Sequence, residues 1–250
     1  MKLFIVTGSS RGMGEAIARQ LLAPDHFVLG IARRCSEALA AAALQDGAGL
    51  EQWSCDLADP LPVAEQLRAW LAEQAPGRFC EAVLINNAGV VTEPGPIDSV
   101  PLALLSGALR VGLEATLLLS SAFLGATRGW AAPKKILNIS SGLGRRAMAA
   151  SAPYCAAKAG MDNLSGALAL DEAQRPDGAR VVSLAPGVID TDMQVQLRSG
   201  DPARFPDQQR FAALKREGLL DSPEQAAAKV LRYLARPDFG SKVLADVRDA

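Results

Sequence analysis

The sequence has a single histidine and few cysteines, and both shortages exclude classes of chemistry. His26 follows Pro24 and Asp25 between an expected helix and an expected strand, so we interpret it as a surface residue. A Ser-His-Asp hydrolase would have to use this histidine, which argues against that class of enzyme. No two cysteines stand two or three positions apart, which argues against a zinc cluster. We expect free thiols without a chemical role at all four positions, Cys35, Cys55, Cys80 and Cys155.

Long runs of one charge and long apolar runs are also missing. The net charge is −1 and no basic run exceeds Arg33-Arg34 or Arg145-Arg146, so we expect no nucleic-acid partner. No apolar run approaches the roughly 18 to 20 residues that span a bilayer. Only Lys2 and a short apolar run precede the first glycine turn, which is unlike a secretory signal. We therefore expect a cytoplasmic protein without a membrane partner.

Apolar runs alternate with helical stretches from one end of the chain to the other. The 250 residues are 49% hydrophobic and show no break in composition and no repeat, which favours one domain, residues 1–250. We expect strands at 3–6, 27–31, 50–54, 82–85, 135–139, 180–184 and 242–247. We expect helices from 15–22, 36–45, 61–74, 102–129, 152–173 and 222–234. Ser36 is the expected N-cap of the second helix.

The apolar runs lack the alternation of polar and apolar residues that is typical of a sheet with one solvent-exposed face. We therefore expect both faces of each strand to be buried. Strands of this kind between helices predict an α/β fold, a Rossmann-type doubly wound parallel sheet of about seven strands with helices on both faces. In such folds ligands bind at the carboxyl ends of the strands. The residues that follow each strand are therefore the candidates for a site.

A glycine-rich turn follows the first expected strand. The residues T-G-S-S-R-G-M-G run from Thr7 to Gly14 and lead into a helix. Such a turn directs unpaired N–H groups and the positive end of a helix dipole at one point, which suits a phosphate. Gly8 and Gly12 would allow positive φ, and Gly14 would let the helix pack closely on the strand. An ordinary turn with chance glycines is the alternative.

Basic residues follow the second expected strand, where an NAD site carries an acid that bonds the ribose 2′-hydroxyl. Arg33 and Arg34 stand there, and Arg11 lies inside the glycine turn. Guanidinium groups form charge-assisted hydrogen bonds with a phosphate. The three arginines therefore favour NADP(H), with solvated surface arginines as the alternative.

A serine, a tyrosine and a lysine form the candidate catalytic set. Ser141 follows the fifth expected strand, and Tyr154 and Lys158 stand four positions apart on one face of the next helix. A tyrosine titrates near pH 10, and we expect the ammonium of Lys158 to lower that pKa toward working pH. Ser141 would donate to a substrate carbonyl. For the tyrosine and lysine alone, a half-exposed helix face is the alternative.

Together with N-N-A-G at Asn86–Gly89, these motifs resemble the short-chain dehydrogenase/reductase family over nearly the whole chain, from Leu3 to Val247. The resemblance implies that Ser141, Tyr154 and Lys158 are catalytic. It implies that Asp56 accepts a hydrogen bond from the adenine amino group and that Thr191 bonds the nicotinamide carboxamide. The cofactor residues implied in this way are Gly8, Ser10, Arg11, Gly12, Met13, Gly14, Arg33, Arg34, Asp56, Leu57, Asn87, Ala88, Gly89, Tyr154, Lys158, Pro186, Gly187, Val188, Ile189 and Thr191.

Three stretches resemble a narrower group, the bacterial benzil reductases, which are similar to sepiapterin reductases. They are N-I-S-S-G at 138–142, A-P-G-V-I-D-T-D-M-Q at 185–194 and R-F-A-A-L-K-R-E-G at 210–218. The resemblance implies NADPH-dependent reduction of one carbonyl of an aromatic 1,2-diketone, with benzil giving (S)-benzoin. It also implies a homodimer or homotetramer that packs through the two long helices, and we expect a mobile lid at 190–218.

Two other functions remain open at this point. One is a short-chain reductase or dehydrogenase for another ketone or alcohol, such as a pteridine side-chain ketone. The other is a non-catalytic NADP-binding sensor. A phosphate-loop hydrolase is excluded because no G-K-[ST] follows the glycine turn.

One position departs from the family pattern. Gly112 occupies the place of an asparagine that, in the family, is thought to hold a water relaying protons to the lysine. A glycine weakens a helix by up to about 1 kcal/mol relative to alanine, and we expect it to leave room for an extra water. If the relay is impaired, Gly112→Asn should be faster. Arg145 and Arg146 either face the substrate and favour an acidic one or, as we prefer, form a solvated loop pair.

Overall fold

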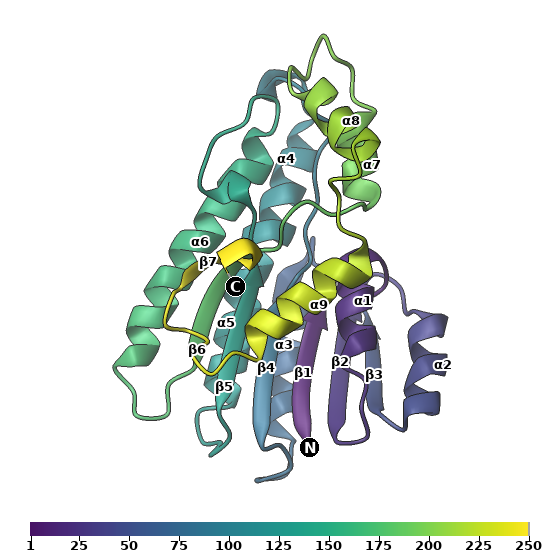
Figure 1. The fold of residues 1–250 in the computed structure, drawn as a ribbon. Coiled ribbons are helices and arrows are strands. Elements are labelled where there is room, and N and C mark those ends of the chain that lie inside the picture. The colour runs from purple at the N-terminus through teal and green to yellow at the C-terminus, as the bar shows by residue number, and fades with distance from the viewer. Residues whose placement is uncertain (250) are drawn as a thin grey trace.

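The computed structural model describes residues 1–249, so the last residue of the expected domain lies outside it. One parallel sheet of seven strands has the order β3-β2-β1-β4-β5-β6-β7 (Figure 1), which confirms the doubly wound fold. The strands are β1 (Lys2–Thr7), β2 (His26–Ala32), β3 (Gly49–Ser54), β4 (Glu81–Asn86), β5 (Lys134–Ile139), β6 (Arg180–Ala185) and β7 (Leu244–Asp246).

Helices cover both faces of the sheet because successive side chains of a strand point to opposite faces (Figure 1). Phe4 and Val6 of β1 pack with α1 (Gly12–Gln20), α2 (Glu37–Asp46) and α9 (Pro223–Leu234). Leu3 and Ile5 pack on the other face with α3 (Pro60–Ala72) and α5 (Ala115–Ala126), beside α6 (Ala152–Ala173). Ser36 caps α2 as predicted, with its Oγ accepting from the Leu39 N–H over 3.1 Å.

The helix expected over 102–129 is divided. It runs as α4 (Leu102–Leu109), a π-helical turn η2 (Arg110–Glu114) and α5. By length and composition alone, Leu102–Ala126 is the one stretch within residues 1–249 that could cross a membrane. Within this stretch 28% of the most apolar window is buried, and Leu119 and Phe123 are fully buried against the sheet.

The segment 190–218, expected to be a lid, contains two helices. These are α7 (Asp192–Arg198) and α8 (Gln208–Arg216), which lie beyond the carboxyl ends of the strands, at the top of Figure 1. Asp190 pairs with Lys215 and, over 2.9 Å, with Arg198. Phe205 is fully buried with its ring centroid 5.5 Å from that of Phe211. The segment therefore has apolar contacts and ion pairs of its own.

The structure agrees with the prediction for the cysteines but not with the prediction for the single histidine. The surface prediction for His26 is wrong, because its ring packs 4.9 Å from that of Phe4 and its Nδ1 lies 2.7 Å from the Leu21 carbonyl oxygen. All four cysteines are free thiols, as predicted, and their lack of a chemical role stays a prediction. Residues 1–249 contain no cluster of histidine, cysteine or acidic side chains that would hold a metal ion.

Candidate active site

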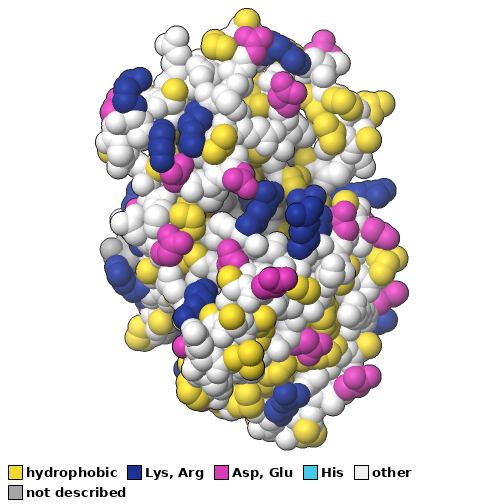
Figure 2. Space-filling model, turned by 90° about the vertical axis from the view of Figure 1, so that its right-hand side faces the viewer, with side chains coloured by type: hydrophobic (Ala, Val, Ile, Leu, Met, Phe, Trp, Pro, Cys, Tyr) yellow, Lys and Arg dark blue, Asp and Glu magenta, His cyan; other side chains and the backbone are white. Residues whose placement is uncertain are grey.

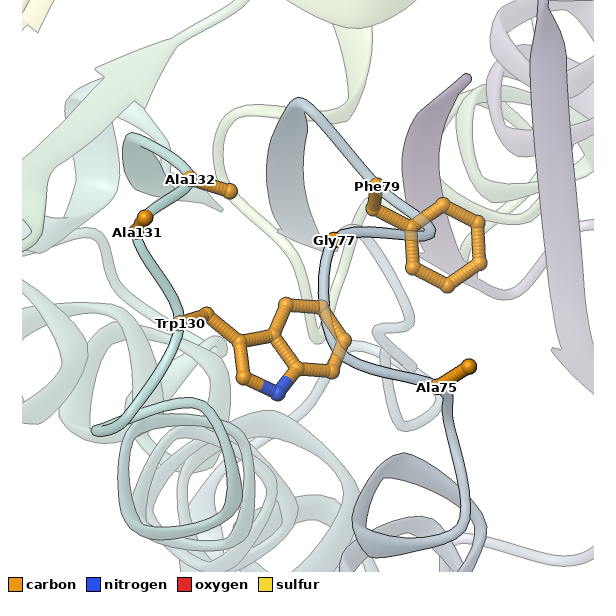
Figure 3. A pocket seen from close by; sticks show the side chains of 6 residues that line it. All are labelled: Ala75, Gly77, Phe79, Trp130, Ala131 and Ala132. Atoms are coloured by element: carbon orange, nitrogen blue, oxygen red, sulfur yellow. The ribbon is translucent and has the colours of Figure 1, made fainter.

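A cleft of about 1360 Å³ opens at the carboxyl ends of the strands, below α7 and α8. Figure 2 shows the face on which α1 and α2 lie, with Lys and Arg side chains gathered near mid-height. A second hollow, at the opposite end of the sheet, measures only about 60 Å³ (Figure 3). Phe79, Trp130, a glycine and three alanines line it, so it presents no charged group. The large cleft is therefore the candidate site.

The glycine turn forms a backbone cradle at one end of the cleft. Gly8 and Gly12 have φ of +70° and +56°, a region that favours glycine. A Cβ on Gly14 would lie 2.1 Å from the Gly8 carbonyl oxygen, closer than any real contact. A Cβ on Gly8 would lie 3.0 Å from the side-chain nitrogen of Asn87. The turn therefore keeps its backbone accessible, and it fits the diphosphate of a dinucleotide.

Thr7 ties this turn to the N-N-A-G segment. Its hydroxyl accepts hydrogen bonds from the backbone N–H groups of Asn87 and Ala88, both over 2.9 Å. The Asn87 side chain donates to the Thr7 carbonyl oxygen over the same distance. The two motifs, 80 residues apart in sequence, therefore form one rigid floor of the cleft.

The basic residues predicted to bind a 2′-phosphate are not equivalent. Among the described residues, Arg11 and Arg33 line the cleft and Arg34 lies outside its lining. Arg11 donates to the carboxylate of Asp192, at the start of α7, over 2.6 Å. Asp56 also lines the cleft, and its Oδ1 accepts from the Ala58 N–H over 2.9 Å.

Ser141, Tyr154 and Lys158 come together on one wall of the cleft, from the end of β5 and the first turns of α6. Burial raises the pKa of Tyr154, and a hydrogen bond from Ser141 partly opposes the rise. The prediction that Lys158 lowers the pKa of the tyrosine is therefore wrong for the free protein. The Lys158 Nζ lies 5.8 Å from the centroid of the tyrosine ring.

Lys158 is itself buried and donates to the Ile139 carbonyl oxygen over 2.6 Å. Burial lowers the pKa of its ammonium to about 8, against the opposing charge of Asp162. The ammonium is thus still charged at neutral pH. A Cβ on Gly89 would lie 3.7 Å from the same Nζ, an ordinary van der Waals contact, so Gly89 lies directly beside the lysine.

Asp162 organises a buried network behind the catalytic set. Its carboxylate accepts from the hydroxyls of Ser140 and Ser183, over 2.5 and 2.6 Å. Arg145 donates to it over 3.2 Å and also bonds the carbonyl oxygen of Ala245 over 2.9 Å. Arg145 is an exposed loop residue, as preferred, but it also fastens α6 to β6 and β7. Arg146 does line the cleft.

Gly112 lies in the π-helical turn and is buried against α6. A Cβ there would lie 2.9 Å from the Cβ of Ala157, between Tyr154 and Lys158 in the chain. The expected space for an extra water is therefore absent on this side of Gly112 among the described residues. An asparagine would push α6 away, so we no longer expect Gly112→Asn to be faster.

The other predicted cofactor residues also line the cleft, namely Ser10, Met13, Leu57, Pro186, Gly187, Val188, Ile189 and Thr191. Sequence reasoning missed the wall formed by the lid segment, including Met193, Gln194, Leu197 and Phe211. The helical spacing of residues 193, 194 and 197 was the available signal, but the many polar residues around them obscured it.

Comparison with known proteins assigns the family. The family model described as short chain dehydrogenase matches residues 2–202. A benzil reductase, (S)-benzoin forming, from Bacillus cereus is 34% identical over 239 residues, 96% of each chain. A sepiapterin reductase from Meriones unguiculatus is 33% identical over 259 residues, covering 98% of this chain and 95% of the other. A solved structure of a putative 2-deoxy-d-gluconate 3-dehydrogenase from Agrobacterium tumefaciens with bound NADP has a TM-score of 0.79 at 25% identity, covering 98% of this chain and 94% of the other.

The chain belongs to the short-chain dehydrogenase/reductase family. It is an oxidoreductase that acts on CH–OH and C=O groups of small molecules, and its fold binds a nicotinamide cofactor. Among the relatives compared, it is similar to carbonyl reductases of the benzil and sepiapterin types.

Proposed function

We propose that this protein is an NADPH-dependent reductase of aromatic 1,2-diketones, which converts one carbonyl of benzil to give (S)-benzoin. The observation that carries the proposal is the pairing of two walls in one cleft. Ser141 and Tyr154 supply polar groups for one carbonyl oxygen on one wall. The other wall is apolar and suits the aromatic rings of the substrate. Its side chains include Val91, Leu104, Leu143, Met148 and Phe211.

Each catalytic residue has a distinct part. When bound, the nicotinamide supplies the hydride. Tyr154 holds its proton at neutral pH, because burial raises its pKa, and donates that proton to the carbonyl oxygen being reduced. Ser141 donates a hydrogen bond to the same oxygen and orients it. The charged Lys158 stabilises the phenolate left on Tyr154 and bonds the nicotinamide ribose.

The choice of NADPH over NADH rests on Arg11 and Arg33. Both line the cleft near the glycine cradle, where an acid would repel a 2′-phosphate. The four residues directly after β2, Arg33 to Ser36, include no acid, and the carboxylate that Arg11 contacts is that of Asp192. Charge-assisted hydrogen bonds from guanidinium groups would hold the phosphate.

Three further assignments concern the lid segment, the exposed leucines and the free thiols. We propose that the segment 190–218 closes over the substrate and excludes water. We propose a homodimer or homotetramer that buries the exposed leucines of the long helices, including Leu102, Leu109 and Leu117. The four free thiols support a reducing compartment, the cytoplasm.

The substrate assignment is tested with benzil and the purified protein. Consumption of NADPH is followed by absorbance, with NADH in a parallel reaction, and the benzoin is separated on a chiral column. We expect faster consumption with NADPH and (S)-benzoin as the product. No consumption with benzil, or a clear preference for NADH, would contradict the proposal. Turnover of a pteridine side-chain ketone without turnover of benzil would favour the sepiapterin-type activity.

A further inference from the structure

Gln194 is a buried amide without a partner in the wall of the cleft. Its side chain, on the first turn of α7, is 6% exposed, and its Oε1 bonds no group within residues 1–249. Gln194 lines the same cleft as Ser141 and Tyr154. A buried amide oxygen without a hydrogen bond is unfavourable, so native proteins usually satisfy it with a ligand or water.

The second unpaired buried oxygen of the described chain belongs to Asn86 and differs in one respect. The Asn86 amino group donates to the Asn138 side chain over 2.9 Å, so that amide is held in one orientation. Within residues 1–249 no such bond fixes the Gln194 amide. A half-turn about its last torsion therefore presents either the carbonyl or the amino group to a ligand.

Helix α7, which carries Gln194, is held at both ends. Ion pairs hold its two ends, from Arg11 to Asp192 and from Asp190 to Arg198. Leu197, one turn further on, is 7% exposed and lines the cleft beside Gln194. The amide is thus held at the wall by an ordered helix.

With the amide turned so that its N–H faces the cleft, a 1,2-diketone supplies an acceptor for it. Its two carbonyl oxygens are both acceptors, and Ser141 with Tyr154 is proposed to hold only the one that is reduced. The second oxygen would otherwise face apolar side chains such as Val91 and Phe211. The nicotinamide carboxamide does not compete, because its proposed partners are the preceding residues Val188 to Thr191.

We propose that Gln194 is a specificity-determining residue, whose amide N–H donates to the second carbonyl oxygen of the diketone. This inference rests on the proposed function. It assigns the preference for a diketone over a monoketone to one side chain of the lid segment. A site built to hydrogen-bond a substrate group discriminates against an analogue that lacks that group, because the site is then left unpaired.

The test compares benzil with deoxybenzoin, which keeps both rings but has one carbonyl. The ratio of their kcat/KM values is measured for the wild type and for Gln194→Met, which is similar in size and donates no hydrogen bond. The intrinsic reactivities of the two ketones cancel in this comparison. Gln209→Met, at an exposed glutamine of α8 that is not among the described residues lining the cleft, is the matched control.

We expect Gln194→Met to lower the benzil-to-deoxybenzoin ratio about 3- to 10-fold, the range for one lost hydrogen bond, while Gln209→Met leaves it unchanged. Gln194→Glu, whose carboxylate accepts but does not donate, should lower the ratio at least as far. Thermal unfolding of Gln194→Met without ligand should occur no lower than in the wild type, because an unpaired buried oxygen has been removed.

Two results would overturn the inference, and they are distinguishable. If the wild type reduces both ketones and the ratio is the same in Gln194→Met, the inference fails while the proposed function stands. If the wild type reduces neither ketone with NADPH, the proposed function fails and the inference fails with it.

Discussion

Arg11 of the glycine turn and Asp192 of α7 form an ion pair across the cleft, with 2.6 Å between guanidinium nitrogen and carboxylate oxygen. The pair joins the sheet side of the cleft to the lid segment, 181 residues further along the chain. Both side chains are more than half exposed, so the pair contributes little to folding. A 2′-phosphate bound by Arg11 would compete with Asp192, which links cofactor binding to the position of the lid.

Asp192→Asn tests this competition. Because Arg11 is then free of its carboxylate partner, we predict that NADPH binds about two- to fivefold more tightly at low salt, while NADH binding is unchanged. Titration of the nicotinamide fluorescence measures both dissociation constants. Asp207→Asn makes the same charge change elsewhere in the lid segment and should have no effect. Weaker NADPH binding in Asp192→Asn would contradict the competition.

Arg33 and Arg34 provide a matched pair for the cofactor preference. Arg33 lines the cleft and Arg34 does not, although they are neighbours in sequence. We predict that Arg33→Ala raises the KM for NADPH about 10-fold or more, as expected for a lost charge-assisted hydrogen bond. The KM for NADH should not change. Arg34→Ala should have a smaller effect. Equal effects of the two variants, measured by steady-state kinetics, would show that long-range charge alone sets the preference.

Lys158 should reduce stability at neutral pH because its ammonium is buried. Its pKa falls from the ordinary 10.5 to about 8, which corresponds to about 3 kcal/mol of destabilisation below pH 8. Between pH 8 and 10.5 the unfolded chain binds more protons than the folded one, so wild-type stability rises with pH. We predict that Lys158→Met is inactive but more stable at pH 7, and that its advantage shrinks toward pH 10.

Urea unfolding at pH 7 and pH 9.5 measures this difference. Lys135→Met is a useful control, since it removes an ammonium that pairs with Glu81 over 2.8 Å. That variant should gain no stability at pH 7. A stability advantage of Lys158→Met that does not change with pH would contradict the assignment of the effect to the buried charge.

Gly112 is predicted to matter for packing. In Gly112→Ala the new Cβ, 2.9 Å from that of Ala157, forces the π-helical turn and α6 apart. We expect the free energy of unfolding to fall by about 1 kcal/mol or more, the size of effect that overpacking causes. We also expect a lower kcat, because α6 carries Tyr154. In Gly125→Ala a Cβ would meet no described atom within 4 Å, so this helix substitution should be neutral or stabilising. Thermal unfolding and kcat of both variants decide the point.

The features that sequence reasoning predicted are those fixed by local rules. The glycine turn follows from a strand, a turn and a helix start, and the common face of Tyr154 and Lys158 follows from the helical period. The Arg145 network escaped prediction because its partners lie up to 100 residues away. The rise in the pKa of Tyr154 depends on how deeply the folded chain buries it. Contacts between distant segments and burial are set only by the tertiary structure.

The central claim is that Tyr154 donates the proton in NADPH-dependent reduction of a diketone. The most direct measurement is the rate of NADPH consumption with benzil by Tyr154→Phe, beside Tyr233→Phe. Tyr233, the second tyrosine of the sequence, is buried in α9 with the core on the other side of the sheet. We predict that kcat of Tyr154→Phe falls at least about 100-fold, the usual contribution of a positioned acid, while the variant still binds NADPH. Tyr233→Phe should turn over benzil at the wild-type rate. Undiminished turnover by Tyr154→Phe would contradict the account.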